Sequence, residues 1–96
     1  MTIRMLFRVD SIDSNERHVG YGNDEEGKVD RSKILRAQTA TVSLTPVDPG
    51  SDKDHPNFAH WGPNAQGRVL LNHVLPEVAE QLATGHEYFV DIAPVS

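Results

Sequence analysis

The apolar residues of this 96-residue chain recur at every second position along much of its length, and one short stretch has helical spacing. A period of two is typical of strands buried on one side. The strand-like segments follow one another without the long crossovers that parallel strands need. We therefore expect a mainly β fold of the α+β kind. In it, a small antiparallel sheet curls into a barrel or sandwich, as a single domain over residues 1–96.

The strand pattern is interrupted by groups of turn-forming residues. Residues 11–16 contain Asp13, Ser14 and Asn15, which bond readily to their own backbone and predict the turn of a hairpin. Residues 22–27 place three acids between two glycines and predict a mobile, exposed connection. The expected strands cover residues 3–9, 17–22, 34–47, 67–74 and 87–92.

One short helix is expected between the last two strands. Pro76 suits its first turn, because the missing N–H would have no partner there, and Gly85 suits the left-handed residue that ends it. The apolar positions of this helix are Leu75, Val78, Ala79 and Leu82.

The composition excludes several classes of protein. Without cysteine there is no disulfide scaffold, thiolate zinc site or cysteine nucleophile. Nine Lys and Arg against fourteen Asp and Glu give a net charge of −5, which disfavours a duplex-DNA binder or a polybasic membrane anchor. No signal-peptide pattern and no apolar run of roughly 18 residues is present, so we expect no membrane contact and a location in the host cytoplasm or a virion.

The segment 48–67 is the strongest indication of a binding function. It is rich in Pro and Gly, has no sustained period and holds the only tryptophan. Irregular segments of this length in small domains are usually binding or mobile loops. The aromatic residues Phe58 and Trp61 either pack into the core or contact a partner, and the sequence leaves both alternatives open. The candidate binding residues are His55, Asn57, Phe58, His60 and Trp61.

Metal binding and catalysis have little support in the sequence. His55 and His60 lie near three upstream aspartates, but their spacing matches no defined zinc motif, and the aspartates do not form a calcium loop. No nucleophile elbow, phosphate-binding glycine loop or deaminase signature is present. We therefore expect no metal, no cofactor, no catalytic residues and no enzymatic activity.

Four segments in the C-terminal half carry a resemblance to a known group. The group consists of small uncharacterised β-rich proteins of tailed bacteriophages and prophages, and the likeness covers residues 40–93. It implies a phage-type origin and no particular activity. The segments are Val42-Ser43-Leu44-Thr45-Pro46-Val47, Asn57-Phe58-Ala59-His60-Trp61-Gly62-Pro63, Gly67-Arg68-Val69-Leu70-Leu71-Asn72 and Gly85-His86-Glu87-Tyr88-Phe89-Val90-Asp91-Ile92.

Two hypotheses of function follow. The first is a non-enzymatic phage-type accessory protein that binds a macromolecular partner, a virion or assembly component or a host factor, through the 48–67 loop. The alternative is a module that binds a small ligand such as a nucleotide, or single-stranded nucleic acid, by stacking on the loop aromatics. Because the edge strands of so small a sheet readily pair with another copy, we also expect a homo-oligomer.

Overall fold

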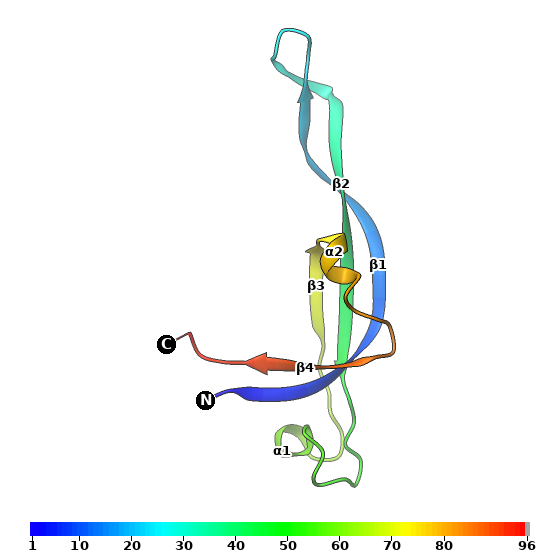
Figure 1. Cartoon of the computed structure of the whole chain (residues 1–96), viewed down its shortest axis with the longest axis vertical. Coiled ribbons are helices and arrows are strands. Elements are labelled where there is room, and N and C mark those ends of the chain that lie inside the picture. The colour runs from blue at the N-terminus through cyan, green and yellow to red at the C-terminus, as the bar shows by residue number, and fades with distance from the viewer. Residues whose placement is uncertain (96) are drawn as a thin grey trace.

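The computed structural model describes residues 1–95, which form one four-stranded antiparallel sheet and two short helices (Figure 1). The elements are β1 (Ile3–Asn23), β2 (Val29–Pro46), α1 (Phe58–Trp61), β3 (Val69–Val74), α2 (Pro76–Ala79) and β4 (Glu87–Ile92). The strand order is β3-β2-β1-β4. The mainly β, antiparallel fold is confirmed, and a short helix does lie between the last two strands. The sheet of these residues is open, with β3 and β4 at its edges, and does not close into a barrel.

The largest element is the hairpin of β1 and β2, whose strands are 21 and 18 residues long. Its turn is the acid-rich segment that the sequence predicts as a mobile connection. The carboxylate of Asp24 accepts hydrogen bonds from the backbone N–H groups of Glu26 and Lys28, both at 2.9 Å. Gly27 takes a φ of 80°, which residues with a side chain rarely adopt. These contacts fix where the chain reverses.

The turn predicted over residues 11–16 is wrong, because β1 continues through them. Their shorter side-chain hydrogen bonds are made to β2. Asn15 donates from Nδ2 to Thr41 Oγ1 at 3.0 Å, and Gln38 donates to a carboxylate oxygen of Glu16 at 3.0 Å. Pairing with a neighbouring strand therefore overrides the local turn preference of this segment.

The buried core is small and lies where all four strands and α2 come together. Val9 and Val42 are fully buried on the two strands of the hairpin, and Ala79 closes over them from α2. Trp61 and several half-buried side chains pack against this cluster. The buried apolar residues are Phe7, Val9, Ala40, Val42, Leu44 and Ala79.

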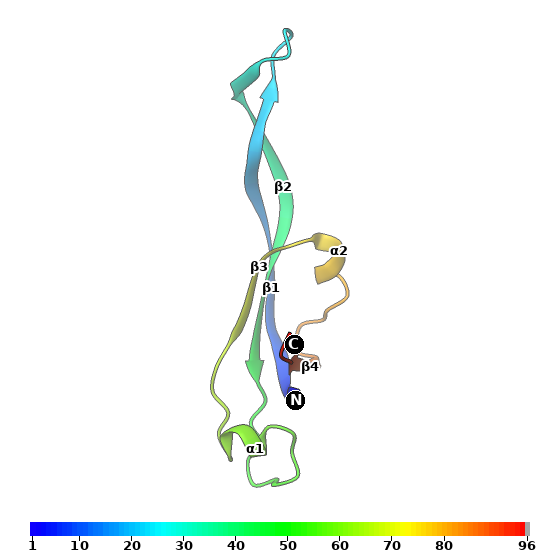
Figure 2. The same ribbon diagram turned by 90° about the vertical axis from the view of Figure 1, so that its left-hand side faces the viewer.

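Above the core the hairpin continues alone as an arm, residues 15–38, which we call the hairpin arm. In two perpendicular views no other element lies beside it (Figures 1 and 2). None of its side chains is buried. The radius of gyration is 19.4 Å, whereas a compact domain of this length has about 13 Å. The protein exposes 6971 Å², about 1,500 Å² more than a compact monomer of its mass.

Candidate functional site

Asn57 joins the 48–67 loop to the sheet. Its side chain is fully buried. Oδ1 accepts from the backbone N–H of Leu6 at 2.7 Å, and Nδ2 donates to the carbonyl oxygens of Leu6 and Val47, both at 2.8 Å. The backbone N–H of Asn57 donates to Nδ1 of His55 at 3.1 Å. Both donors of this amide and one acceptor site are thus used inside the protein, so Asn57 positions the loop.

Two ring side chains of the loop, Trp61 and His60, also contact β1. The rings of Trp61 and Phe7 meet edge to face, with centroids 6.3 Å apart, and Trp61 is half-buried. His60 is exposed, but its Nε2 lies 3.1 Å from the carbonyl oxygen of Arg4. Phe58 is half-buried and begins α1. Three of the five candidate residues, Asn57, His60 and Trp61, therefore lie against β1.

A binding role for this loop stays a prediction. The exposed parts of His60 and of the half-buried Phe58 and Trp61 are the surface that it offers. The side chains of Asn57 and His55 are engaged within the protein. Within residues 1–95, no three His, Cys, Asp or Glu side chains gather closely enough to hold a metal ion.

Arg4 and Asp91 form an exposed ion pair across β1 and β4. Two parallel hydrogen bonds join them, at 2.7 and 2.9 Å. These bonds raise the pKa of Arg4 and lower the pKa of Asp91. The guanidinium also lies 4.9 Å from the ring centroid of Phe89, within the range of a cation–π contact. The charge of Arg4 is therefore already matched, which weakens the case for a nucleic-acid surface on β1.

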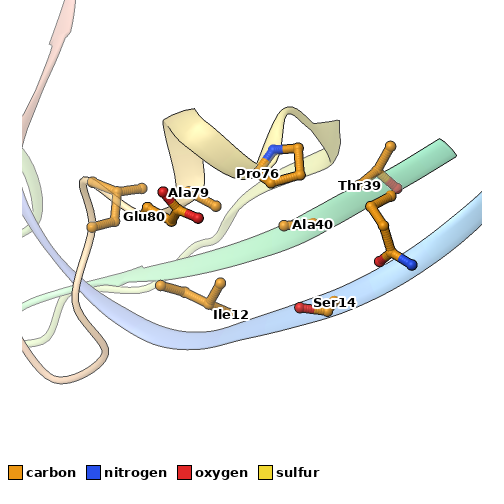
Figure 3. Close-up of a pocket in the computed structure, with 9 residues that line it drawn as sticks. Ile12, Ser14, Thr39, Ala40, Pro76, Ala79 and Glu80 are labelled. Carbon is orange, nitrogen blue, oxygen red and sulfur yellow. The ribbon is translucent and has the colours of Figure 1, made fainter.

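A cavity of about 390 Å³ lies where the hairpin arm leaves the core, between α2 and the two long strands (Figure 3). Its volume falls within the range of small-ligand pockets. Thr39 is 5% exposed, and its Oγ1 has no hydrogen-bond partner among the described residues. The lining residues are Ile12, Ser14, Gln38, Thr39, Ala40, Pro76, Ala79, Glu80 and Leu82.

The unpartnered hydroxyl of Thr39 has a measurable consequence. We expect Thr39→Val to stabilise the protein by about 1–2 kcal/mol, because a buried hydroxyl without a hydrogen bond loses its hydration and gains nothing. The free energy of unfolding in urea measures the change. Thr41→Val is the matched control, since Thr41 Oγ1 accepts a hydrogen bond from Asn15 and its loss gives no gain. Destabilisation by Thr39→Val would show that the hydroxyl has a partner in solution.

The hairpin arm carries more large exposed apolar side chains than β3 or β4. Five large apolar side chains lie on it, each at least 40% exposed. The ring of Tyr21 packs edge to face on His18 at 4.7 Å, and the guanidinium of Arg31 lies 6.0 Å from the Tyr21 ring centroid. Asp30 accepts from the hydroxyl and backbone N–H of Ser32, which lowers its pKa. The apolar side chains are Val19, Tyr21, Val29, Ile34 and Leu35.

Comparisons with protein-family models, with curated proteins and with solved structures each gave no match. None of the helices in residues 1–95 is long and apolar enough to cross a membrane.

Sequence reasoning did not identify the arm as a functional element. The available signal was the pair Ile34 and Leu35, because adjacent apolar residues in a strand point to opposite faces. Such a pair predicts that both faces of the strand are buried. In the structure both faces are exposed at this point, and the sequence does not show this. The sequence instead predicts the loop 48–67 as the binding segment, because this loop is irregular and holds the only tryptophan.

Proposed function

We propose that this chain is a non-enzymatic accessory protein that binds a macromolecular partner, and that the hairpin arm, rather than the 48–67 loop alone, makes the contact. The observation that carries the proposal is the group of five large exposed apolar side chains on residues 15–38, among them the cross-strand pair Tyr21 and Ile34. Clusters of exposed apolar side chains on a small protein mark interaction sites. The resemblance to phage and prophage proteins supports a virion or assembly component or a host factor as the partner.

The stability of the arm supports the same proposal. A two-stranded hairpin is marginally stable in water unless a further strand or a helix covers it. The arm receives neither within residues 1–95, and its strands are held by backbone pairing and by exposed contacts such as that of Tyr21 with His18. A partner that adds a strand would stabilise it.

The alternative, binding of a nucleotide or a single strand by the loop aromatics, has weaker support. Stacking needs an aromatic face that is open to a base. Trp61 packs against Phe7 and is half-buried, and the nearby cation of Arg4 is paired with Asp91. Titration of Trp61 fluorescence with nucleotides and oligonucleotides tests this alternative, and we expect little quenching.

Site-specific photocrosslinking in the cells that produce the protein tests the proposed function. A benzophenone amino acid replaces Tyr21 in the arm, Ala59 in the loop or Thr84, an exposed residue before β4. We expect a discrete heavier adduct from position 21 and none from the control position 84. An adduct from position 59 with none from position 21 would move the contact to the loop. No adduct from either would overturn the proposal.

A further inference from the structure

The arm has two uncovered strand edges. β4 pairs with β1 from Ile3 to Arg8, and β3 pairs with β2 from Ala40 to Leu44. Past these points, the backbone N–H and C=O groups on the outer side of each strand have no neighbouring strand. Uncovered edges of this kind readily pair with a strand of another molecule.

The edge of β2 is poorly suited to pairing. The register between the two strands jumps from Tyr21↔Ile34 to Gly22↔Asp30, so residues 31–33 have no pairing partner on β1. Irregularities and cations are both features that prevent edge-to-edge contact. The cations on this part of β2 are Arg31, Lys33 and Arg36.

The edge of β1 is regular. Its register with β2 shifts between Val9 and Ser11 and again between His18 and Gly20. Between these shifts, residues 11–18 pair without interruption, contain no proline and carry one Lys or Arg, Arg17, against three on the β2 edge. β1 therefore presents eight consecutive regularly paired residues with an open outer edge.

We propose that this edge pairs with the same edge of a second copy, as antiparallel strands related by a two-fold axis at Asn15. The inference rests on the proposed function and names the first partner of the arm. Two identical antiparallel strands on a two-fold axis pair residues whose numbers have an even sum, because paired side chains point to the same face. The axis therefore passes between one residue and its own copy. The charged residues determine which residue this is.

With the axis at Asn15, Asp13 lies opposite the partner's Arg17, and the symmetry repeats this ion pair. An axis at Glu16 places two carboxylates opposite each other, and an axis at Arg17 places two guanidinium groups opposite each other. Opposite charges across strands stabilise and like charges destabilise. Of these three positions, only an axis at Asn15 pairs opposite charges and places no like charges opposite each other.

The exposed surface is consistent with such an interface. The excess of about 1,500 Å² over a compact monomer exceeds the roughly 800 Å² that each protein contributes to an interface of standard size. Bulges increase the local twist and bend a strand. The two register shifts that bound residues 11–18 therefore limit the pairing to that stretch.

The backbone pattern makes the proposed register testable by disulfide trapping. Val9 directs its N–H and C=O toward the β4 side, where they bond to His86 and Gly85. After the one-residue shift at Asp10, even-numbered residues direct theirs outward. Asn15 then meets its copy as a non-hydrogen-bonded pair, with Cα atoms about 4.5 Å apart, which a disulfide can bridge.

We expect Asn15→Cys to form a disulfide-linked dimer under mild oxidation of the full chain. The natural sequence has no cysteine, so the new thiol has only its copy as a partner. Ser11→Cys is the matched control on the same strand, because its two copies lie eight residues out of register and Ser11 takes no part in the proposed ion pairs, and we expect it to form no disulfide-linked dimer. Equal crosslinking of both variants, or of neither, would overturn the proposed pairing.

Charge reversal gives a second test that does not depend on a thiol. Asp13→Arg and Arg17→Asp alone should each weaken self-association roughly tenfold in sedimentation equilibrium, because attraction becomes repulsion at two symmetric positions. The double variant should restore it. Circular dichroism checks that each variant folds. Failure of the double variant to recover association would count against the Asn15 register.

These outcomes separate the inference from the proposed function. Suppose that Asn15→Cys forms no disulfide-linked dimer while the probe at position 21 still yields an adduct that is not twice the chain mass. Pairing with a second copy is then wrong, and binding to another partner stands. If neither variant nor probe links to anything, both fall.

Discussion

Replacing Asn57 with alanine is expected to lower the free energy of unfolding by about 3 kcal/mol. The side chain makes three hydrogen bonds to the backbone of Leu6 and Val47, and its removal leaves these partly buried groups without partners. Each buried polar group that loses its hydrogen bond costs about 1–3 kcal/mol. Urea unfolding followed by circular dichroism measures the change.

Two further variants sharpen this expectation. Asn57→Asp keeps the size of the side chain but loses both N–H donors, and it sets a carboxylate against the carbonyl oxygens of Leu6 and Val47. We expect it to be at least as destabilising as Asn57→Ala. Asn64→Ala removes an exposed amide from the same loop and should change stability by less than about 0.5 kcal/mol. Similar stabilities for all three would show that the amide does not hold the loop.

Replacing Phe7 with alanine is expected to destabilise the protein by about 3–4 kcal/mol. Phe7 is 4% exposed, belongs to a core of six buried apolar residues and supports the ring of Trp61. Truncation of a buried phenylalanine typically costs about 3–5 kcal/mol. Since a domain of this length has a stability on the order of 5 kcal/mol, much of the margin would be lost. The emission of Trp61 should shift to the red.

Phe89→Ala is the matched control for this prediction. Phe89 is 55% exposed on β4, and its main contact is the guanidinium of Arg4. We expect a loss of no more than about 1 kcal/mol and unchanged Trp61 emission. A loss as large as that of Phe7→Ala would mean that the face of β4 bearing Phe89 is covered in solution.

The alternating pattern predicted the class of the fold and the final strand over residues 87–92 correctly. It failed at residues 11–16, where Asp13, Ser14 and Asn15 favour a turn locally and yet extend because β2 supplies their partners. Local preference cannot anticipate a contact made with residues some 25 positions later. The same limit placed the hairpin turn in the middle of β1 instead of after its last residue, Asn23.

The candidate site was predicted only in part. The loop 48–67 was recognised as irregular, and Asn57, His60 and Trp61 do come together there. Their contacts with Leu6, Arg4 and Phe7 on β1 were not visible, because no pattern in the sequence relates the two segments. The arm was not predicted for a different reason. Alternating apolar residues indicate a strand face that is normally buried, and the sequence does not show which of these faces stay exposed.

The pairing of β1 with two very different strands also bears on how the chain folds. β2 closes onto β1 through a short turn, whereas Ile3 meets Ile92, almost the full length of the chain away. The entropy lost on closing a loop grows with its length, and non-local pairings slow folding. We therefore expect the hairpin to form first, starting at the turn at Asp24. The β1–β4 contact, which joins Ile3 to Ile92, is then expected to form last and to limit the folding rate.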